Sequence, residues 1–150
     1  MSFADQLVVL REGRLVQAGR PRDVYAAPAD VATALFLGPS IILDAEVRDG
    51  VAHCALGALA LREDQRRPGG SVKIMLRPEQ ISLVAADSDA SPAWRVAAVG
   101  QTGSFARVTL EHAPVAGENH AVTFVAMARD IPSAGAKVNV IVLGAAHRLS

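Results

Sequence analysis

The tetrapeptide Arg77-Pro78-Glu79-Gln80 places a guanidinium, a carboxylate and an amide around one proline. The residues before it alternate, with Val72, Ile74 and Leu76 on one face, and residues 81–84 resume the alternation, as in strands with one buried face. Pro78 has no N–H for a strand ladder and ends the first strand. The sequence therefore predicts a strand, a rigid corner and a second strand.

Two roles are open for this corner. In the structural role, Arg77 and Glu79 fix it through hydrogen bonds to each other or to the backbone. In the functional role, Arg77, Pro78, Glu79 and Gln80 form a regulatory or interface site that contacts a partner subunit or a regulatory ligand. Guanidinium, carboxylate and amide groups suit recognition by hydrogen bonds and ion pairs.

The sequence offers no metal site. No two of its histidines have the three- or four-residue spacing of a helical metal pair, and no cysteine or acidic cluster joins them. We expect all four on the surface or at loop edges, although a ferric-iron sensor site is the alternative. They are His53, His112, His120 and His147. Cys54, the single cysteine, excludes an intrachain disulfide and reads as a small buried apolar side chain.

Catalytic and nucleic-acid motifs are also absent. A phosphate-binding P-loop needs a lysine after glycine, and neither Lys73 nor Lys137 follows one. The segment 100–103 has the Gly-x-x-Gly spacing of an RNA-binding loop but no basic residue, so we expect a β-turn. The aromatic side chains available for stacking fit core positions instead: Trp94, Phe105 and Phe124. We expect no catalytic residue, no bound cofactor and no nucleic-acid partner.

Composition indicates a globular protein of the cytoplasm. Hydrophobic residues make up 51% of the 150 residues and charged residues 20%, enough for a sizeable core. Lys plus Arg and Asp plus Glu number 15 each, so no net charge attracts nucleic acid or an anionic membrane. No apolar run approaches a membrane span, and residues 1–5 do not resemble a signal peptide.

The first 39 residues predict a hairpin and two helices. Leu7 to Leu10 is a continuous apolar run, typical of a strand buried on both faces, and a turn leads to a second strand over 15–18. Pro21 opens a helix to Ala26, and Asp30 caps a second helix from Val31 to Leu37. Such a hairpin needs a sheet beside it. We therefore expect either that it pairs with a neighbouring chain or that it folds onto the β-structure that follows.

Short strands at spacings of about ten residues follow, without helices, as in a small antiparallel barrel or sandwich. Asp49-Gly50 predicts a type I′ hairpin. Charged or polar loops are expected over 63–70 and 86–92. The strands other than those flanking the corner are expected over residues 41–48, 51–56, 58–61, 94–99, 105–112, 121–127 and 137–143.

Two stretches resemble ATP-binding subunits of ABC transporters. Residues 2–38, including Leu-Val-Val-Leu-Arg-Glu-Gly-Arg-Leu-Val-Gln-Ala-Gly-Arg-Pro, are similar to the segment after the switch histidine of the ATPase domain. Leu-Arg-Pro-Glu-Gln at 76–80 resembles the C-terminal regulatory domain, called TOBE, of such subunits, most of all in ferric-iron importers. The resemblance implies a division into the end of the nucleotide-binding domain over 1–39 and a TOBE domain over 40–150. The latter would hold two OB-like barrel units, near 40–84 and 92–148.

This resemblance implies a piece of a longer protein that couples ATP hydrolysis to import. The piece would regulate and dimerise the subunit at the inner face of the cell membrane, with a second copy and the membrane-embedded permease subunits as partners. ATP and magnesium would bind the longer protein, and the piece itself would not hydrolyse ATP. Polyamine, sulfate and sugar importers carry similar corners. The other classes left open are a stand-alone oxyanion-binding barrel and an oligonucleotide-binding protein.

Overall fold

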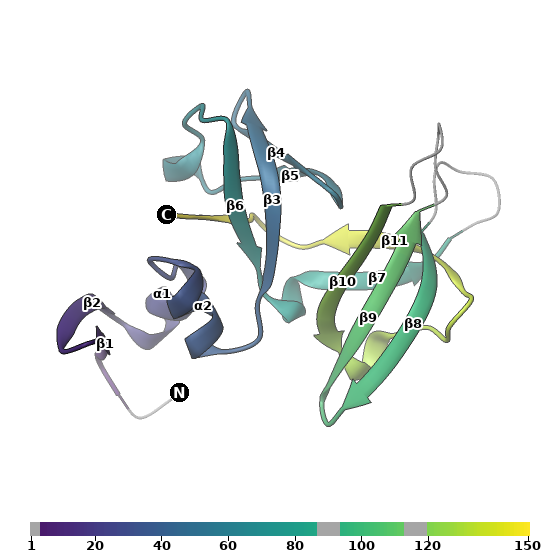
Figure 1. The fold of residues 1–150 in the computed structure, drawn as a ribbon, viewed down its shortest axis with the longest axis horizontal. Helices are drawn as coiled ribbons and strands as arrows, with labels where there is room; N and C mark the ends of the chain where they lie inside the picture. Colours follow the sequence, from purple (N-terminus) through teal and green to yellow (C-terminus); the bar gives the residue numbers. More distant parts are fainter. Residues whose placement is uncertain (1–3, 87–93, 113–119) are drawn as a thin grey trace.

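The computed structural model of the protein describes residues 4–86, 94–112 and 120–150. Figure 1 shows three parts in a row: an N-terminal hairpin with two short helices, a first five-stranded sheet, and a second five-stranded sheet at the opposite end. Residues 87–92 of the polar loop expected from the sequence lie outside the described residues. None of the helices in the described part of the chain is both long and apolar enough to cross a membrane.

The hairpin and helices follow the expected local signals. Strands β1 (Leu7–Arg11) and β2 (Arg14–Gly19) pair antiparallel around a two-residue turn with positive φ angles at Glu12 (52°) and Gly13 (74°). Helix α1 (Pro21–Ala26) starts at its proline. Helix α2 (Val31–Leu37) is capped by Asp30, whose carboxylate accepts a hydrogen bond of 2.8 Å from the Thr33 amide.

The environment of the hairpin differs from the sequence prediction. Val9 is buried, but Val8 and Leu10 are 51% and 64% exposed, so β1 is not buried on both faces. The hairpin packs beside the helices, where the Arg11 guanidinium binds the Asp30 carboxylate at 2.9 and 3.0 Å. It pairs with neither five-stranded sheet, so the expectation that it folds onto the β-structure is wrong. Pairing with a neighbouring chain stays a prediction.

The first five-stranded sheet, here called sheet I, has the strand order β12-β6-β3-β4-β5. Its antiparallel strands are β3 (Ile41–Arg48), β4 (Val51–Cys54), β5 (Gly57–Ala60), β6 (Ser71–Leu76) and β12 (His147–Leu149). The turn between β3 and β4 has φ of 50° at Asp49 and 76° at Gly50, which confirms the type I′ prediction. A one-turn 3₁₀ helix, η1 (Glu63–Gln65), lies in the loop between β5 and β6.

The second five-stranded sheet, sheet II, has the order β10-β9-β8-β11-β7. Its strands are β7 (Ile81–Ala85), β8 (Trp94–Thr102), β9 (Phe105–His112), β10 (His120–Met127) and β11 (Lys137–Val142). A 3₁₀ turn, η3 (Ala128–Asp130), follows β10. Strand β8 runs on through Gly100 to Thr102, and the turn lies at 103–104, so the turn expected over 100–103 begins later than predicted.

The mainly β fold with a leading hairpin and two short helices is confirmed. One hydrophobic cluster contains buried residues of both sheets, among them Ile74 of sheet I and Val108 of sheet II. The strand pairing closes neither sheet into a barrel, although an isolated parallel bridge between Leu61 and Ala146 joins the two edges of sheet I. Trp94 and Phe124 are core residues as expected, whereas Phe105 is half-buried. The division into OB-like units stays a prediction.

Strand β6 departs most from its predicted pattern. Ile74 and Leu76 face the main core as the alternation predicts, but Met75 and Arg77 on the other face are also buried, with 1% and 3% exposure. Helix α2 accounts for this, because Ala34 packs with Met75 and Leu149 in a second, smaller cluster. Helix α2 therefore covers the part of the outer face of sheet I around Met75 and Leu149, whereas Lys73 and Asp44 on the same face stay exposed.

Candidate functional site

The predicted corner is where the chain passes from sheet I to sheet II. Strand β6 ends at Leu76, the 3₁₀ turn η2 (Pro78–Gln80) follows, and β7 begins the other sheet at Ile81. Pro78 is fully buried in this turn. Within it the side chain of Gln80 accepts a hydrogen bond of 2.9 Å from the Arg77 amide, which fixes the turn locally.

The Arg77 guanidinium forms hydrogen bonds with the helical segment and not within the corner itself. The side chain donates two hydrogen bonds to the Tyr25 carbonyl, of 2.7 and 3.2 Å, and stacks on the Tyr25 ring with 3.9 Å between the guanidinium carbon and the ring centroid. The remaining acceptors belong to the end of α2 and the link to β3. They are the carbonyls of Ala34, Gly38 and Pro39 at 3.2–3.3 Å and the Ser40 hydroxyl at 2.6 Å.

These acceptors explain how a buried cation is tolerated. The last carbonyls of a helix have no partner within the helix and carry partial negative charge. Arg77 satisfies such carbonyls from both α1 and α2, at Tyr25 and Ala34. Burial lowers the pKa of Arg77, but a guanidinium keeps its proton in proteins. In the described part of the chain no carboxylate forms an ion pair with it.

Glu79 and Gln80 extend the contacts of the corner in two directions. The exposed Glu79 accepts a hydrogen bond of 3.1 Å from the Tyr25 hydroxyl, and burial together with the Glu79 charge raises the pKa of that phenol. Gln80 donates to the carbonyls of Leu143 and Ala145, at 3.0 and 3.1 Å, in the link that leads to β12. Arg77 thus makes backbone hydrogen bonds, one of the two alternatives predicted for it, although to the helical segment. The prediction is wrong for Glu79, which binds the Tyr25 hydroxyl and neither Arg77 nor the backbone.

His147 is the residue of this region that sequence reasoning missed. It was expected near the surface, but it is 8% exposed, and its Nε2 lies 2.8 Å from the Pro28 carbonyl between α1 and α2. A carbonyl can only accept, so Nε2 carries the hydrogen. Strand β12 has only three residues, too few for a periodic signal, so this burial could not be predicted from the sequence.

Arg77, Glu79, Gln80 and His147 together form what we call the corner joint. All except Gln80 bind the segment 21–40, and Gln80 holds the link that leads to His147. A pocket of about 360 Å³ opens beside it, lined by Tyr25, Arg62, Arg77, Glu79 and Gln80 among others. The arrangement is one of mechanical attachment, because the polar groups of Arg77 and Gln80 are occupied by backbone atoms.

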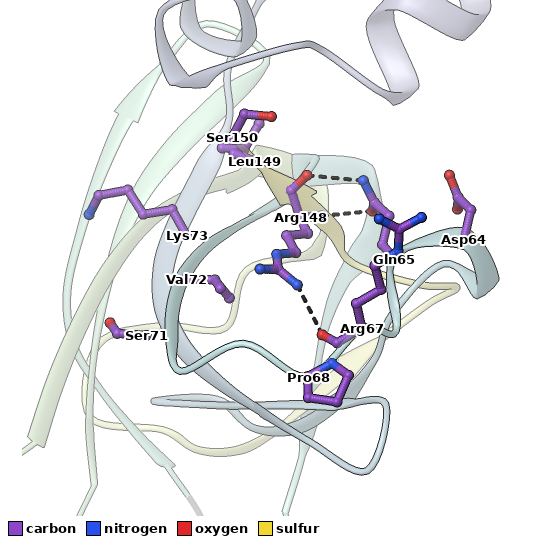
Figure 2. Close-up of a pocket in the computed structure, with 10 residues that line it drawn as sticks. All are labelled: Asp64, Gln65, Arg67, Pro68, Ser71, Val72, Lys73, Arg148, Leu149 and Ser150. Atoms are coloured by element: carbon purple, nitrogen blue, oxygen red, sulfur yellow. Dashed lines mark hydrogen bonds between the residues drawn. The ribbon is translucent and has the colours of Figure 1, made fainter.

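A larger pocket, of about 670 Å³, lies between the loop 64–71 and the end of β12 (Figure 2). Its basic side chains do not converge: Lys73 points away from Arg148 and pairs with Asp44 at 2.7 Å. The Arg148 guanidinium donates to the Arg67 carbonyl at 3.0 Å, and two hydrogen bonds join the Arg148 backbone to the Gln65 side chain. The pocket gives no specific support to an oxyanion site.

Metal binding has no support either. No group of three His, Cys, Asp or Glu side chains within residues 4–86, 94–112 and 120–150 is placed to hold an ion. Cys54 is half-buried against the core, and burial raises the pKa of its thiol, as expected for an unreactive apolar side chain.

Similar proteins carry one consistent description. The chain is 41% identical over 148 residues to the Fe(3+) ions import ATP-binding protein FbpC of Serratia marcescens. The identity is 39% to the protein of the same description from Pseudomonas fluorescens strain Pf0-1 and 35% to that from Yersinia pseudotuberculosis. Each match covers 98% of this chain. The chain is a relative of these ATP-binding subunits. The resemblance to ABC transporter subunits of the ferric-iron group is thereby confirmed.

The extent of the match limits what it says about the whole protein. The chain spans 41% of the Serratia relative and 42% of the other two. No protein-family model matches the chain. The corner joint lies within the matched 98%, but its role is a matter for inference from the geometry.

Proposed function

We propose that this chain is the regulatory and dimerising end of the ATP-binding subunit of an ABC importer, with ferric iron as the preferred cargo. Its first 39 residues form the end of the nucleotide-binding domain and residues 40–150 the TOBE domain. The cargo is inferred from the relatives, which are described as Fe(3+) ions import ATP-binding proteins. ATP and magnesium belong to other parts of the longer protein, since this sequence has no P-loop.

The observation that supports a regulatory role is the attachment made by Arg77. One buried side chain from the corner binds carbonyls at the ends of both helices of the N-terminal segment. A movement of that segment relative to sheet I must break these bonds or carry the sheet with it. The corner joint is therefore suited to couple the state of an ATPase domain to the regulatory domain, at the cytoplasmic face of the membrane beside the permease subunits.

The coding sequence directly upstream gives the first test. The proposal expects an open reading frame continuing upstream through a switch histidine, a Walker B strand and a P-loop. A start codon at Met1 with no such upstream frame would contradict it and favour a free-standing barrel protein.

Dimerisation needs a separate measurement. Light scattering of the longer protein should give a homodimer, and deletion of residues 40–150 should shift the equilibrium towards monomer. Deletion of an unrelated surface loop of similar exposure serves as the control. An unchanged dimer after the deletion would remove the dimerising role while leaving the assignment to the ATP-binding subunit intact.

A further inference from the structure

The imidazole of His147 stands out among the buried groups because only one of its nitrogens is used. Nε2 donates to the Pro28 carbonyl at 2.8 Å. Nδ1 is buried and has no hydrogen-bonding partner among the residues that the structure describes. The neutral ring therefore joins β12 to the connection between α1 and α2 through one hydrogen bond, with a bare nitrogen on its other side.

Burial, more than the charged groups around the ring, disfavours a second proton. Arg77 of the corner and Arg62, just after β5, act against the imidazolium, and Asp64 of η1 acts for it. The helical segment contributes the Pro28 carbonyl, which is already used by Nε2. Desolvation is the largest influence, and in sum the pKa of His147 lies below its ordinary value of 6.5.

We propose that His147 makes the attachment of the helical segment to sheet I sensitive to protons. A proton added at Nδ1 creates a buried N–H without an acceptor among the described residues. The ring relieves this by giving up its hydrogen bond to the Pro28 carbonyl. The link between α1 and α2 then separates from β12, and the helices open locally while the two sheets stay folded. The inference rests on this geometry and not on the proposed role in transport.

The direction of the pH dependence follows from linkage. A histidine whose pKa is lowered by folding binds fewer protons when docked than when released. The attachment is thus at full strength above about pH 6.5, and weakens as the pH falls from there towards the lowered pKa of the docked ring. Because one proton is taken up, the opening equilibrium changes by at most about tenfold for each pH unit.

Amide hydrogen exchange of the 150-residue chain tests this directly. The Ala27 and Ala34 amides report on α1 and α2, since they donate to the backbone carbonyls of Asp23 and Asp30 in the helical hydrogen-bonding pattern. The Val96 amide, bound to the Ala136 carbonyl in sheet II, is the internal reference for intrinsic exchange and global unfolding. Between pH 7.5 and 5, the helix amides should lose protection relative to Val96, by up to about tenfold per pH unit below 6.5.

His147→Gln is the decisive variant, because its amide can still donate to Pro28 but does not titrate in this range. The relative protection of the helix amides should then become independent of pH. His53→Gln, at an exposed position of β4, is the matched control and should behave as the wild type. A wild type without the relative loss, or a His147→Gln chain that keeps it, would overturn the proposal.

If His147→Gln does not fold, the imidazole resonance of the wild type decides. A His147 ring that titrates below 6.5, together with the loss of helix protection, supports the proposal. A ring that titrates at or above 6.5 refutes it.

Discussion

At the scale of single residues, Arg77 carries the attachment between the N-terminal segment and the sheets. It is 3% exposed and donates to carbonyls that have no other donor in their helices. Arg77→Met keeps the apolar stem and removes the guanidinium, so the Tyr25 and Pro39 carbonyls lose their donor, while the carbonyls of Ala34 and Gly38 are left to share the Ser40 hydroxyl. We expect a loss of about 3 kcal/mol in the free energy of unfolding, measured as a lower urea midpoint.

Arg95→Met is the matched control for that substitution. Arg95 lies in β8 and pairs with Glu111 at 2.6 Å, but both side chains are substantially exposed, 60% and 43%. Exposed ion pairs contribute little, so the free energy of unfolding should change by no more than about 0.5 kcal/mol. Similar losses in the two variants would show that Arg77 is not the special attachment that its contacts indicate.

At the scale of elements, α2 depends on the carboxylate at its start. Asp30 accepts from the Thr33 amide and binds Arg11, and the Arg11 contact is the largest influence holding the pKa of Asp30 well below its usual range. Asp30→Ala should cost about 1 kcal/mol through the lost cap. Asp30→Asn keeps a cap but cannot titrate.

The two Asp30 variants separate capping from charge. Folding lowers the pKa of this carboxyl, so its charged form stabilises the folded state above the unfolded-state pKa of about 4. This contribution to stability is lost as the pH falls below that value. Acid titration by circular dichroism should therefore show a steeper loss of stability for the wild type than for Asp30→Asn below about pH 4. Parallel curves would mean that Arg11 and Asp30 do not interact in solution.

The elements also show how far sequence reasoning reaches. Local signals sufficed for the hairpin turn at Asp49-Gly50, the cap at Asp30 and the break at Pro78, because each depends on a few neighbouring residues. The partners of Arg77 could not be read from the sequence, since they lie 37 to 52 positions away in the chain. The exposure of β1 also differs from its apolar pattern, because tertiary surroundings and not periodicity decide burial.

At the scale of the whole molecule, the proposed boundary near residue 39 predicts which part of the chain folds by itself. The main hydrophobic cluster draws buried residues from both sheets and has no member among residues 4–40. Only the smaller cluster crosses the boundary, where Ala34 packs with Met75 and Leu149. Residues 40–150 should therefore fold alone, with a lower urea midpoint than the full chain, because Met75 and Arg77 lose the cover of α2.

A double-mutant comparison tests that boundary together with the role of Arg77. In residues 1–150, Arg77→Met breaks contacts to the helices; in residues 40–150, the carbonyls of Tyr25, Ala34 and Gly38 are absent and Arg77 faces water. The substitution should thus cost about 3 kcal/mol in the long chain and less than about 1 kcal/mol in the short one. An equal cost in both chains would mean that Arg77 stabilises the sheets themselves and not their attachment to the helices. A short chain that does not unfold cooperatively would show that the helices belong to the same folding unit, and the two-domain division would have to be given up.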